Sequence, residues 1–395
     1  MTVQVARRTS PARSPARGSG PGVGGPAPEP TGWAATLQRE ILTATCWLDP
    51  EDPGQRHSAT VRFSGRRIGA TGRPRTGDRF TKDETVEEVV GGSGPVAVTT
   101  RISGLTPGEW LVTARPVGRA GPPLVEPRGT TQLDRSTANG HWLWPWRYRA
   151  MAAAGDGPVR TALKPLAPVP GVIPGAYPFF VVVGIVVGLV AQGIILRRNH
   201  LPVGGALTVS AWAIAAGAMG AKLWYVAGHK GRRFDGWCIQ GFVVFAALVA
   251  AWGATVSLRM PVGAFLDPMA PGLLAGMGIG RIGCFFAGCC SGRPTSSRWG
   301  VWSSDQRIGA RRIPTQLMES ALAISIAAST FVLLYLWTPS KSGAVFVEAL
   351  AMYTLGRQAL LSLRARPRYT RFGRPVVSAL AAAAVLAAAL VGVTG

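Results

Sequence analysis

The chain has 395 residues, of which 47% are hydrophobic and 15% are charged, and 42 Lys and Arg against 19 Asp and Glu give it a formal net charge of +23. A basic composition is also typical of nucleic-acid-binding proteins. Here, however, long apolar runs fill the chain after residue 170, and Arg beside such runs sets membrane topology and contacts anionic lipid. The composition therefore indicates membrane lipid, and not nucleic acid, as a partner.

Residues 1–30 contain Pro, Gly, Ala, Ser and Arg but almost no large apolar side chains. Such a segment cannot bury enough surface to offset its conformational entropy, so we expect a disordered basic tail. It also has no apolar stretch after its basic start, so we do not expect a signal peptide here.

Residues 31–120 have the pattern of a small β domain. Short β-type runs at 60–63, 96–102 and 110–114 are separated by clusters of Gly, Pro and Asp, and this spacing predicts an antiparallel sandwich. A Leu-Thr-Pro-Gly turn precedes Trp110 and resembles the end of a fibronectin type III module, where that family usually has Tyr in place of the Trp. The same pattern also fits an unrelated small β domain.

Residues 121–170 are a Pro-, Arg- and Trp-rich linker, whose aromatic segment 141–148 suits either a membrane interface or packing against the β domain. From residue 171 on, about seven apolar runs are near the length that crosses a hydrocarbon core. We therefore predict an all-α polytopic membrane bundle of about seven transmembrane helices in residues 171–395, preceded by the small all-β sandwich-like domain. The predicted spans are 174–196, 205–227, 238–257, 265–288, 315–337, 343–363 and 375–394.

Segment 278–293 reads Gly-Ile-Gly-Arg-Ile-Gly-Cys-Phe-Phe-Ala-Gly-Cys-Cys-Ser-Gly-Arg and places Arg281 inside an apolar, Gly-rich run. Charge at membrane depth is costly, so an intramembrane Arg indicates a functional site. The segment resembles the signature of the prolipoprotein diacylglyceryl transferase family, Gly-Arg-x-Gly-Asn-Phe-x-Asn-Gly-x-x-x-Gly-Arg. The matching residues are Gly280, Arg281, Gly283, Phe285, Gly288, Gly292 and Arg293.

Other segments resemble the same family in the same order. Residues 313–319 are similar to its His-Pro-Ser-Gln-Leu-Tyr-Glu, residues 343–357 to its Gly-Ala…Gly-Tyr-Gly-x-x-Arg helix, and residues 220–225 to its Gly-Gly-Arg-x-Gly-Tyr. The resemblance covers residues 171–395 and implies a multi-pass protein of the bacterial plasma (inner) membrane. It implies transfer of a diacylglyceryl group from phosphatidylglycerol to the lipobox cysteine thiol of prolipoproteins, with glycerol-1-phosphate as the leaving group.

The resemblance also implies a set of site residues. Arg281, Arg357 and Gln240 fall at catalytic positions, and a guanidinium suits phosphate because it binds bidentately and stabilises the charge of a departing phosphate. The counter-charge of Arg281 is then a bound phosphate or, alternatively, the carboxylate of Glu319 or Glu348. We expect no metal and no cofactor. The implied substrate-binding positions are Tyr177, Lys222, Tyr225, Gly283, Cys284, Gly288, Gly292, Arg293, Gln316, Glu319 and Tyr353.

The sequence departs from the family pattern at several polar positions. The family's His falls at Gln240, which cannot accept a proton as a base; its two signature Asn positions are Cys284 and Ala287, and its acidic residue is Cys289. A thiol acceptor is partly ionised near neutrality, so loss of the base should matter less than loss of an Arg. A phospholipid-binding relative without catalysis is the alternative.

The chain has five cysteines, and none of their spacings is that of a zinc ribbon. Cysteines in an apolar span commonly pack as small apolar side chains. A third hypothesis is a membrane thiol oxidoreductase, in which Cys284 pairs with Cys289 or Cys290, because adjacent cysteines pair only with strain.

The two indications of membrane orientation disagree. The family resemblance places the N-terminal side outside the cytoplasm and the C-terminus inside. The distribution of Arg and Lys between the loops favours the opposite orientation. We prefer the family orientation, because arginines that serve a site bias the count.

Overall fold

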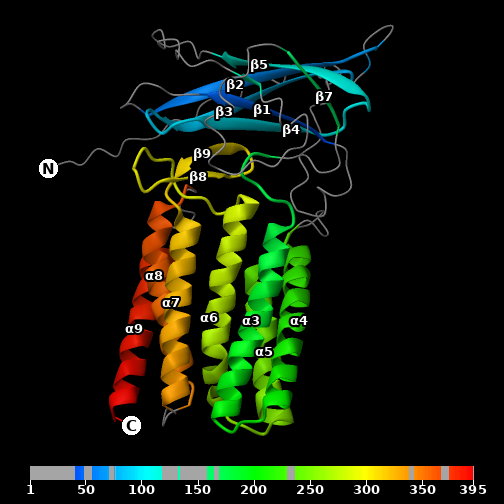
Figure 1. The fold of residues 1–395 in the computed structure, drawn as a ribbon. Coiled ribbons are helices and arrows are strands. Elements are labelled where there is room, and N and C mark those ends of the chain that lie inside the picture. Colours follow the sequence, from blue (N-terminus) through cyan, green and yellow to red (C-terminus); the bar gives the residue numbers. More distant parts are fainter. Residues whose placement is uncertain are drawn as a thin grey trace, which may run out of the picture.

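The computed structural model of the chain describes a β region and a helical bundle (Figure 1). The predicted tail 1–30, the aromatic segment 141–148 and most of the predicted linker lie outside the described residues. The described residues are 41–48, 56–70, 75, 77–117, 132–133, 158–163, 169–228, 236–337, 342–365 and 373–394.

The β region contains two antiparallel sheets, with strand orders β6-β1-β4-β9-β8 and β3-β2-β5-β7. Because each strand pairs antiparallel with its neighbours, the alternating side chains of both sheets can face one interior. The strands are β1 (Leu42–Leu48), β2 (Arg56–Arg67), β3 (Arg79–Val90), β4 (Val96–Ile102), β5 (Glu109–Val117), β6 (Gln132–Leu133), β7 (Val159–Ala162), β8 (Val301–Ser304) and β9 (Ile308–Arg312).

One hydrophobic core lies between the two sheets. It contains Leu42 and Val98 from one sheet and Phe63 and Trp110 from the other, and all four are almost completely buried. The prediction of a small all-β region before the bundle is therefore confirmed. The long strand β3 was not predicted, because most of its side chains are polar, which hides the apolar alternation.

The predicted Pro-Gly turn lies between β4 and β5, which belong to different sheets. Gly104 and Gly108 have positive φ values of 78° and 140°, which only glycine adopts readily. At the end of this turn the indole N–H of Trp110 donates to the Thr106 carbonyl at 3.2 Å. The turn therefore carries the chain across the core instead of closing a hairpin.

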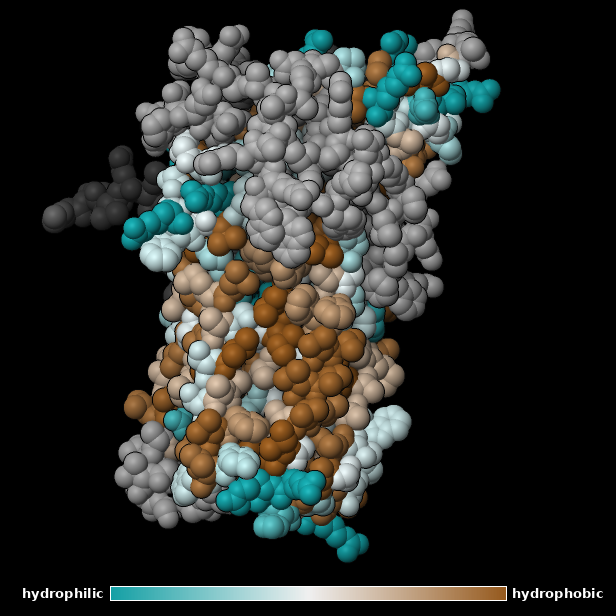
Figure 2. All heavy atoms as spheres, in the orientation of Figure 1, coloured by the Kyte–Doolittle hydropathy of each residue, from teal (hydrophilic) through white to brown (hydrophobic). Residues whose placement is uncertain are grey.

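The bundle contains seven α-helices in the described part of the chain. Apolar side chains predominate on the face of the bundle that Figure 2 shows. Six of the helices are long and apolar enough to cross a membrane, and the described part of the last one is a shorter apolar helix, Gly373–Ala388. A multi-pass bundle is thus confirmed, with six such helices. The helices are α3 (Ala176–Arg198), α4 (Val203–Gly228), α5 (Ile239–Trp252), α6 (Val262–Ala287), α7 (Thr315–Leu336), α8 (Ala344–Leu360) and α9 (Gly373–Thr394).

Glycines bring α3 and α6 into backbone contact. A Cβ on Gly272 would lie 2.2 Å from the carbonyl oxygen of Gly188, and one on Gly184 would lie 2.9 Å from that of Gly276. Small residues allow this approach, because helix association inside lipid depends on close packing. The packing fixes α6, the helix of the signature segment, against the first span.

The helical part also contributes strands to the β region. The hairpin β8–β9 lies in the connection between α6 and α7, and β9 pairs with β4 through Ala97 and Gly309. The Trp302 indole stacks on Trp47 and donates to the Pro95 carbonyl at 2.9 Å. The connection of the signature helix is therefore built into the sheet of the N-terminal part, which the sequence analysis did not foresee.

Candidate functional site at the sheet-facing end of the bundle

The predicted site residues lie at the end of the bundle that faces the sheets. Helices α3, α5 and α7 begin at this end, and α4, α6 and α8 finish there (Figure 1). Up-and-down connectivity therefore brings the signature segment, the start of α7 and the end of α8 to one level of the molecule. The individual contacts divide these residues into two groups.

The first group is centred on a buried carboxylate. The side chain of Glu319 in α7 is 0% exposed, and its Oε2 lies 3.0 Å from Nε of Arg281 in α6. Its other oxygen, Oε1, accepts hydrogen bonds from Arg364, with 3.0 Å to Nε and a shorter contact to the second guanidinium nitrogen. The cluster of Arg281, Glu319 and Arg364 thus carries one negative and two positive charges. Glu319 was one of the two carboxylates considered as the partner of Arg281.

A short backbone ladder brings Arg364 to this cluster. The loop after α6 pairs with the chain after α8: Arg293 N–H donates to the Leu363 carbonyl at 2.9 Å, and Ala365 N–H donates to the Ser291 carbonyl at 3.2 Å. Gly292 is required where the loop meets Ile313, because a Cβ there would lie 2.1 Å from the Ile313 carbonyl oxygen.

Arg312 supports the same loop from β9. Its guanidinium donates to the Gly292 carbonyl at 3.2 Å and pairs with Asp305 at 2.9 Å. Burial lowers the pKa of Arg312 below its ordinary value, and Asp305 opposes that change. The signature loop is therefore held between the end of α8 and the β hairpin.

The end of α6 determines where the cysteines lie. Gly288 takes a left-handed conformation with φ 68°, so that its own N–H bonds to the Phe285 carbonyl and the Cys289 N–H bonds to the Cys284 carbonyl at 3.0 Å. This is the Schellman pattern of helix termination, which folds the chain back onto the last turn. Cys289 is thereby placed beside Cys284.

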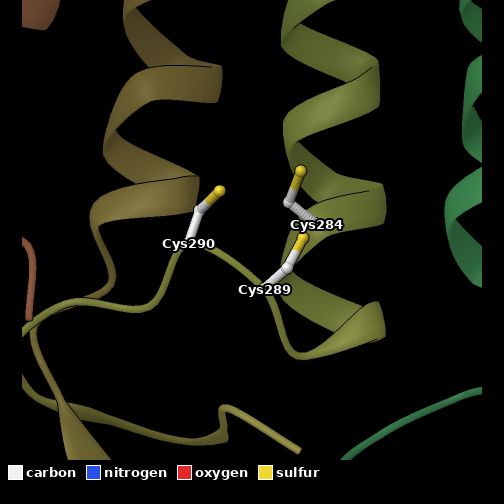
Figure 3. Close-up of side chains that lie close together, drawn as sticks. All are labelled: Cys284, Cys289 and Cys290. Carbon is white, nitrogen blue, oxygen red and sulfur yellow. The ribbon is translucent and has the colours of Figure 1, made fainter. Parts of the chain in front are cut away.

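Cys290 follows in a left-handed conformation with φ 58°, which is unusual for a residue with a side chain. Two residues at the start of α7 hold this backbone: Gln316 donates to the Cys289 carbonyl at 2.9 Å, and Thr315 donates to the Cys290 carbonyl at 3.3 Å. As a result the sulfurs of Cys284, Cys289 and Cys290 all lie within 4.8 Å of one another (Figure 3). All three are free thiols.

Some buried polar atoms of the predicted site residues have no hydrogen-bond partner among the described residues. They include Oε2 of Glu319, Oε1 of Gln316 and Nε of Arg357. Tyr353 is almost completely buried and lies close enough to Arg281 to interact with it electrostatically. Unpaired buried polar groups are costly and call for an explanation, such as a ligand.

Tyr177 and Gly283 connect the first span to this group. A Cβ on Gly283 would lie 2.9 Å from Cβ of Phe180 and 3.3 Å from Cα of Tyr177. The start of α3 therefore lies directly against the signature turn of α6. The side chain of Tyr177 itself is 47% exposed. Arg293 is also exposed, and its Nε donates to the Arg364 carbonyl at 3.4 Å.

The second group lies on α4 and α5. The ammonium of Lys222 donates to the Gly236 carbonyl at 3.2 Å and lies 4.4 Å from the centre of the Trp237 ring. Tyr225 packs against Gly236, where a Cβ would lie 2.3 Å from its ring. Gln240 is exposed and accepts a contact from the Cys238 thiol at 2.8 Å. No described contact joins these side chains to Arg281 or Glu319.

Arg364 and Thr315 contact the site, although no local sequence pattern indicates this. Arg364 follows the predicted span 343–363 directly, where a basic residue fits a role in setting topology. Its pairing with Glu319 depends on the ladder between residues 291–293 and 363–365, which no local pattern predicts. One feature of the sequence does favour this pairing. The predicted spans contain few acidic residues, so Arg281 and Arg364 have few carboxylates to pair with and can share one.

The fold and the site define a class: a polytopic membrane protein with a buried, net positive polar cluster at one end of its bundle. The model of the prolipoprotein diacylglyceryl transferase family matches residues 172–394, more than half of the chain. The chain belongs to this family.

Curated relatives support this assignment. The chain is 32% identical to the phosphatidylglycerol–prolipoprotein diacylglyceryl transferase of Clostridium tetani over 39% of this chain and 66% of the relative. It is 32% identical to transferase 2 of Streptomyces coelicolor, over 42% and 58% respectively. Identity to the Frankia alni transferase is 30%, over 48% of this chain and 54% of that protein. The chain thus spans between about half and two thirds of the length of these relatives.

Proposed function

We propose that this chain transfers the diacylglyceryl group of phosphatidylglycerol to the cysteine thiol of a prolipoprotein. The relatives at about 30% identity carry the name of this activity. The observation that supports it most directly is the cluster of Arg281, Glu319 and Arg364, which carries two positive charges against one negative charge. An anionic phosphate headgroup is the ligand that such a cluster suits.

The proposed reaction is a displacement at carbon. The acceptor sulfur attacks the glyceryl carbon that bears the phosphate ester, so that a C–S bond forms while the C–O bond breaks. The electron pair of the broken bond stays on the phosphate oxygen, glycerol-1-phosphate leaves, and the thiol proton goes to solvent. Negative charge grows on the departing phosphate, and fixed cations at that point lower the barrier.

Within this proposal Arg281 and Arg357 bind the phosphate. Glu319 holds Arg281 and Arg364 in place. Nε of Arg357, which has no hydrogen-bond partner among the described residues, and the hydroxyl of Tyr353 supply donors for the headgroup oxygens. Lys222, Tyr225 and Gln240 face the acceptor from the α4–α5 side. The remaining substrate contacts come from Tyr177, Arg293 and Gln316, beside the signature glycines 283, 288 and 292.

The absence of a basic side chain at position 240 favours one competing function, a phospholipid-binding relative without catalysis. Gln240 accepts the Cys238 thiol contact and cannot take up a proton. The proximity of three free thiols is the observation behind a second competitor, a membrane thiol oxidoreductase. Thioether formation on a lipobox peptide distinguishes transfer from both.

The test is complementation of a strain depleted of its own diacylglyceryl transferase, followed by transfer assays on the purified full chain. Arg281→Lys and Arg357→Lys should each insert normally but lose phosphatidylglycerol binding or turnover by at least about tenfold, or roughly 1.4 kcal/mol. Lysine keeps the charge but loses the planar fork that binds phosphate bidentately. Arg197→Lys is the matched control, because Arg197 is exposed at the opposite end of α3.

Two outcomes would overturn the proposal. Failure of the wild-type chain both to complement and to form the thioether, while it still binds phosphatidylglycerol, would establish the non-catalytic relative. Binding and turnover like wild type in both lysine variants would remove these arginines from the site.

We further propose that α9 is a seventh span and that the protein resides in the bacterial plasma membrane with its β region outside the cytoplasm. The apolar composition of α9 and its position alongside α8 support the seventh span (Figure 1). The two sheets around one core support a fibronectin type III-like sandwich for the β region. At this end of the bundle the site can receive a substrate that has already crossed the membrane.

A further inference from the structure

Three thiols converge at the end of α6, and two of them, Cys284 and Cys289, stand where the family resemblance implies an Asn and an acidic residue. The sulfurs of Cys284, Cys289 and Cys290 lie within 4.8 Å of one another, between the end of α6 and the start of α7 (Figure 3). A tetrahedral zinc ion with Zn–S bonds of about 2.3 Å keeps its sulfurs roughly 3.8 Å apart. Small rotations of the side chains are therefore enough to reach the geometry of a three-sulfur metal site.

The surroundings of the thiols suit an anionic metal–thiolate centre. Three thiolates and one Zn²⁺ together carry one negative charge, and the cluster of Arg281, Glu319 and Arg364 carries one unbalanced positive charge. Arg281 lies three residues before Cys284 on α6, so the two side chains share one side of the helix. Cations beside a cysteine favour its thiolate, which is the form that binds a metal.

The backbone around the thiols is fixed from outside the cluster. Gln316 and Thr315 donate hydrogen bonds to the carbonyl groups of Cys289 and Cys290 at 2.9 and 3.3 Å, and the Schellman turn holds Cys289 beside Cys284. Cys290 is held in a left-handed conformation that it adopts only under constraint. Supporting contacts of this kind orient metal ligands in proteins.

We propose that Cys284, Cys289 and Cys290 bind one zinc ion and that its open fourth position takes up the thiol of the acceptor protein. A site with three protein ligands and one open position is typical of catalytic zinc, whereas structural zinc has four protein ligands. Zinc binding by the three cysteines is independent of the transfer reaction. Binding of the acceptor thiol at the fourth position rests on the proposed transfer function.

Zinc would bring about the deprotonation of the acceptor thiol, for which Gln240 offers no basic group. A thiol that coordinates zinc is deprotonated outright, so the acceptor loses its proton to solvent on binding and needs no general base. The zinc-bound sulfur then attacks the glyceryl carbon; the C–S bond forms, the C–O bond breaks, and glycerol-1-phosphate leaves with the electron pair. The product is a neutral thioether, which binds zinc weakly and dissociates. The zinc is neither oxidised nor reduced.

The first experiment measures metal binding without any activity. The full chain is purified in detergent under reducing conditions, stripped with a chelator, incubated with Zn²⁺ alone and analysed by elemental mass spectrometry. We expect about one zinc per chain in wild type, and a loss of at least about tenfold in the triple variant Cys284→Ser, Cys289→Ser, Cys290→Ser. Cys46→Ala, which removes a thiol from the β region, is the matched control and should keep the metal.

The outcomes of this experiment are decisive for the metal site. Wild-type protein that binds no zinc under these conditions would refute it. Equal zinc content in wild type and the triple variant would refute it as well. If the triple variant fails to fold, the zinc content of the wild-type chain alone still tests the metal site.

The second experiment examines the open position. Co²⁺ replaces zinc in the wild-type chain, and its visible absorption is followed as a lipobox peptide is added, with the Cys→Ser peptide as control. Binding of a fourth sulfur should change the cobalt bands only with the thiol peptide. Identical spectra with both peptides would show that the acceptor does not bind the metal.

Thioether formation, assayed separately, distinguishes the two proposals. Zinc binding without transfer would refute the proposed function and leave the metal site intact. Transfer at full rate by chelator-stripped protein would confirm the function and refute the role of zinc.

Discussion

Replacing Glu319 by Gln should destabilise the helical bundle more than replacing its partner Arg364. The carboxylate is completely buried, and the side chains of Arg281 and Arg364 are only 17% and 15% exposed. At the 3.0 Å separation of Arg281 and Glu319, the Coulomb attraction is about 5–6 kcal/mol for an effective dielectric constant of about 20. Part of this attraction is offset by the cost of removing both charges from water. Removing one partner of a buried pair typically lowers the free energy of unfolding by about 3–5 kcal/mol, because it leaves the other charge uncompensated.

The net charge of the cluster predicts an order among three variants. Glu319→Gln leaves two uncompensated positive charges, Arg364→Gln leaves a neutral pair, and the double variant leaves one positive charge. Stability should therefore fall from Arg364→Gln through the double variant to Glu319→Gln. Adding Arg364→Gln to Glu319→Gln should therefore restore part of the stability that Glu319→Gln alone removes.

Thermal unfolding of the metal-stripped full chain in detergent measures this order at neutral pH. Stripping matters, because a bound metal–thiolate centre would change the charge balance near Arg364. Asp83→Asn is the control, since its pairing with Arg62 is exposed on the β region and should barely affect the midpoint. Equal midpoints for Glu319→Gln and Arg364→Gln, or a double variant less stable than Glu319→Gln, would refute the electrostatic account.

Three further predictions concern packing, topology and the position of the missing base. Gly272→Ala should lower the thermal midpoint and the folded yield, because its Cβ would lie 2.2 Å from the Gly188 carbonyl oxygen, whereas Gly204→Ala, with no atom within 4 Å, should behave as wild type. A cysteine placed at Arg298 should react with a membrane-impermeant reagent from outside the cytoplasm; labelling only from the cytoplasmic side would reverse the proposed orientation. Gln240→His should keep or raise thioether formation, and a sharp loss of activity would show that Gln240 has a positive role of its own.

Local sequence patterns predicted the helical bundle well. Six of the predicted spans are helices long and apolar enough to cross a membrane, because length and hydropathy are properties of each segment alone. The pairing of Arg281 with Glu319 was foreseen only as an alternative, since it requires knowing which faces of α6 and α7 meet. Asp267, in the same helix as Arg281, is used elsewhere: it accepts hydrogen bonds from the backbone N–H groups of Gly343 and Phe346 at the start of α8.

The features that escaped prediction all depend on contacts between distant segments. The strand β9 joins β4 across more than 200 residues of chain, so its pairing through Ala97 and Gly309 has no local signal. Arg364 meets Glu319 only through the ladder that the signature loop forms with the end of α8. The approach of Cys290 to Cys284 depends on a left-handed residue that is not a glycine, which sequence patterns do not indicate.

The proposed zinc site gives the departures of this chain from the family signature a common explanation other than decay of the site. Decay would remove polar groups without gathering others, and it would release the carboxylate and its arginines from any need to stay paired. Instead, Arg281, Glu319 and Arg364 form a fully connected cluster. Two of the signature changes, at Cys284 and Cys289, introduce thiols that meet a third thiol within 4.8 Å. Gln240, in place of a base, removes a group that a metal-bound thiol acceptor would not need. These changes are separated in the sequence but compatible in one mechanism, which is why the metal content of the wild-type chain is the most informative quantity to measure first.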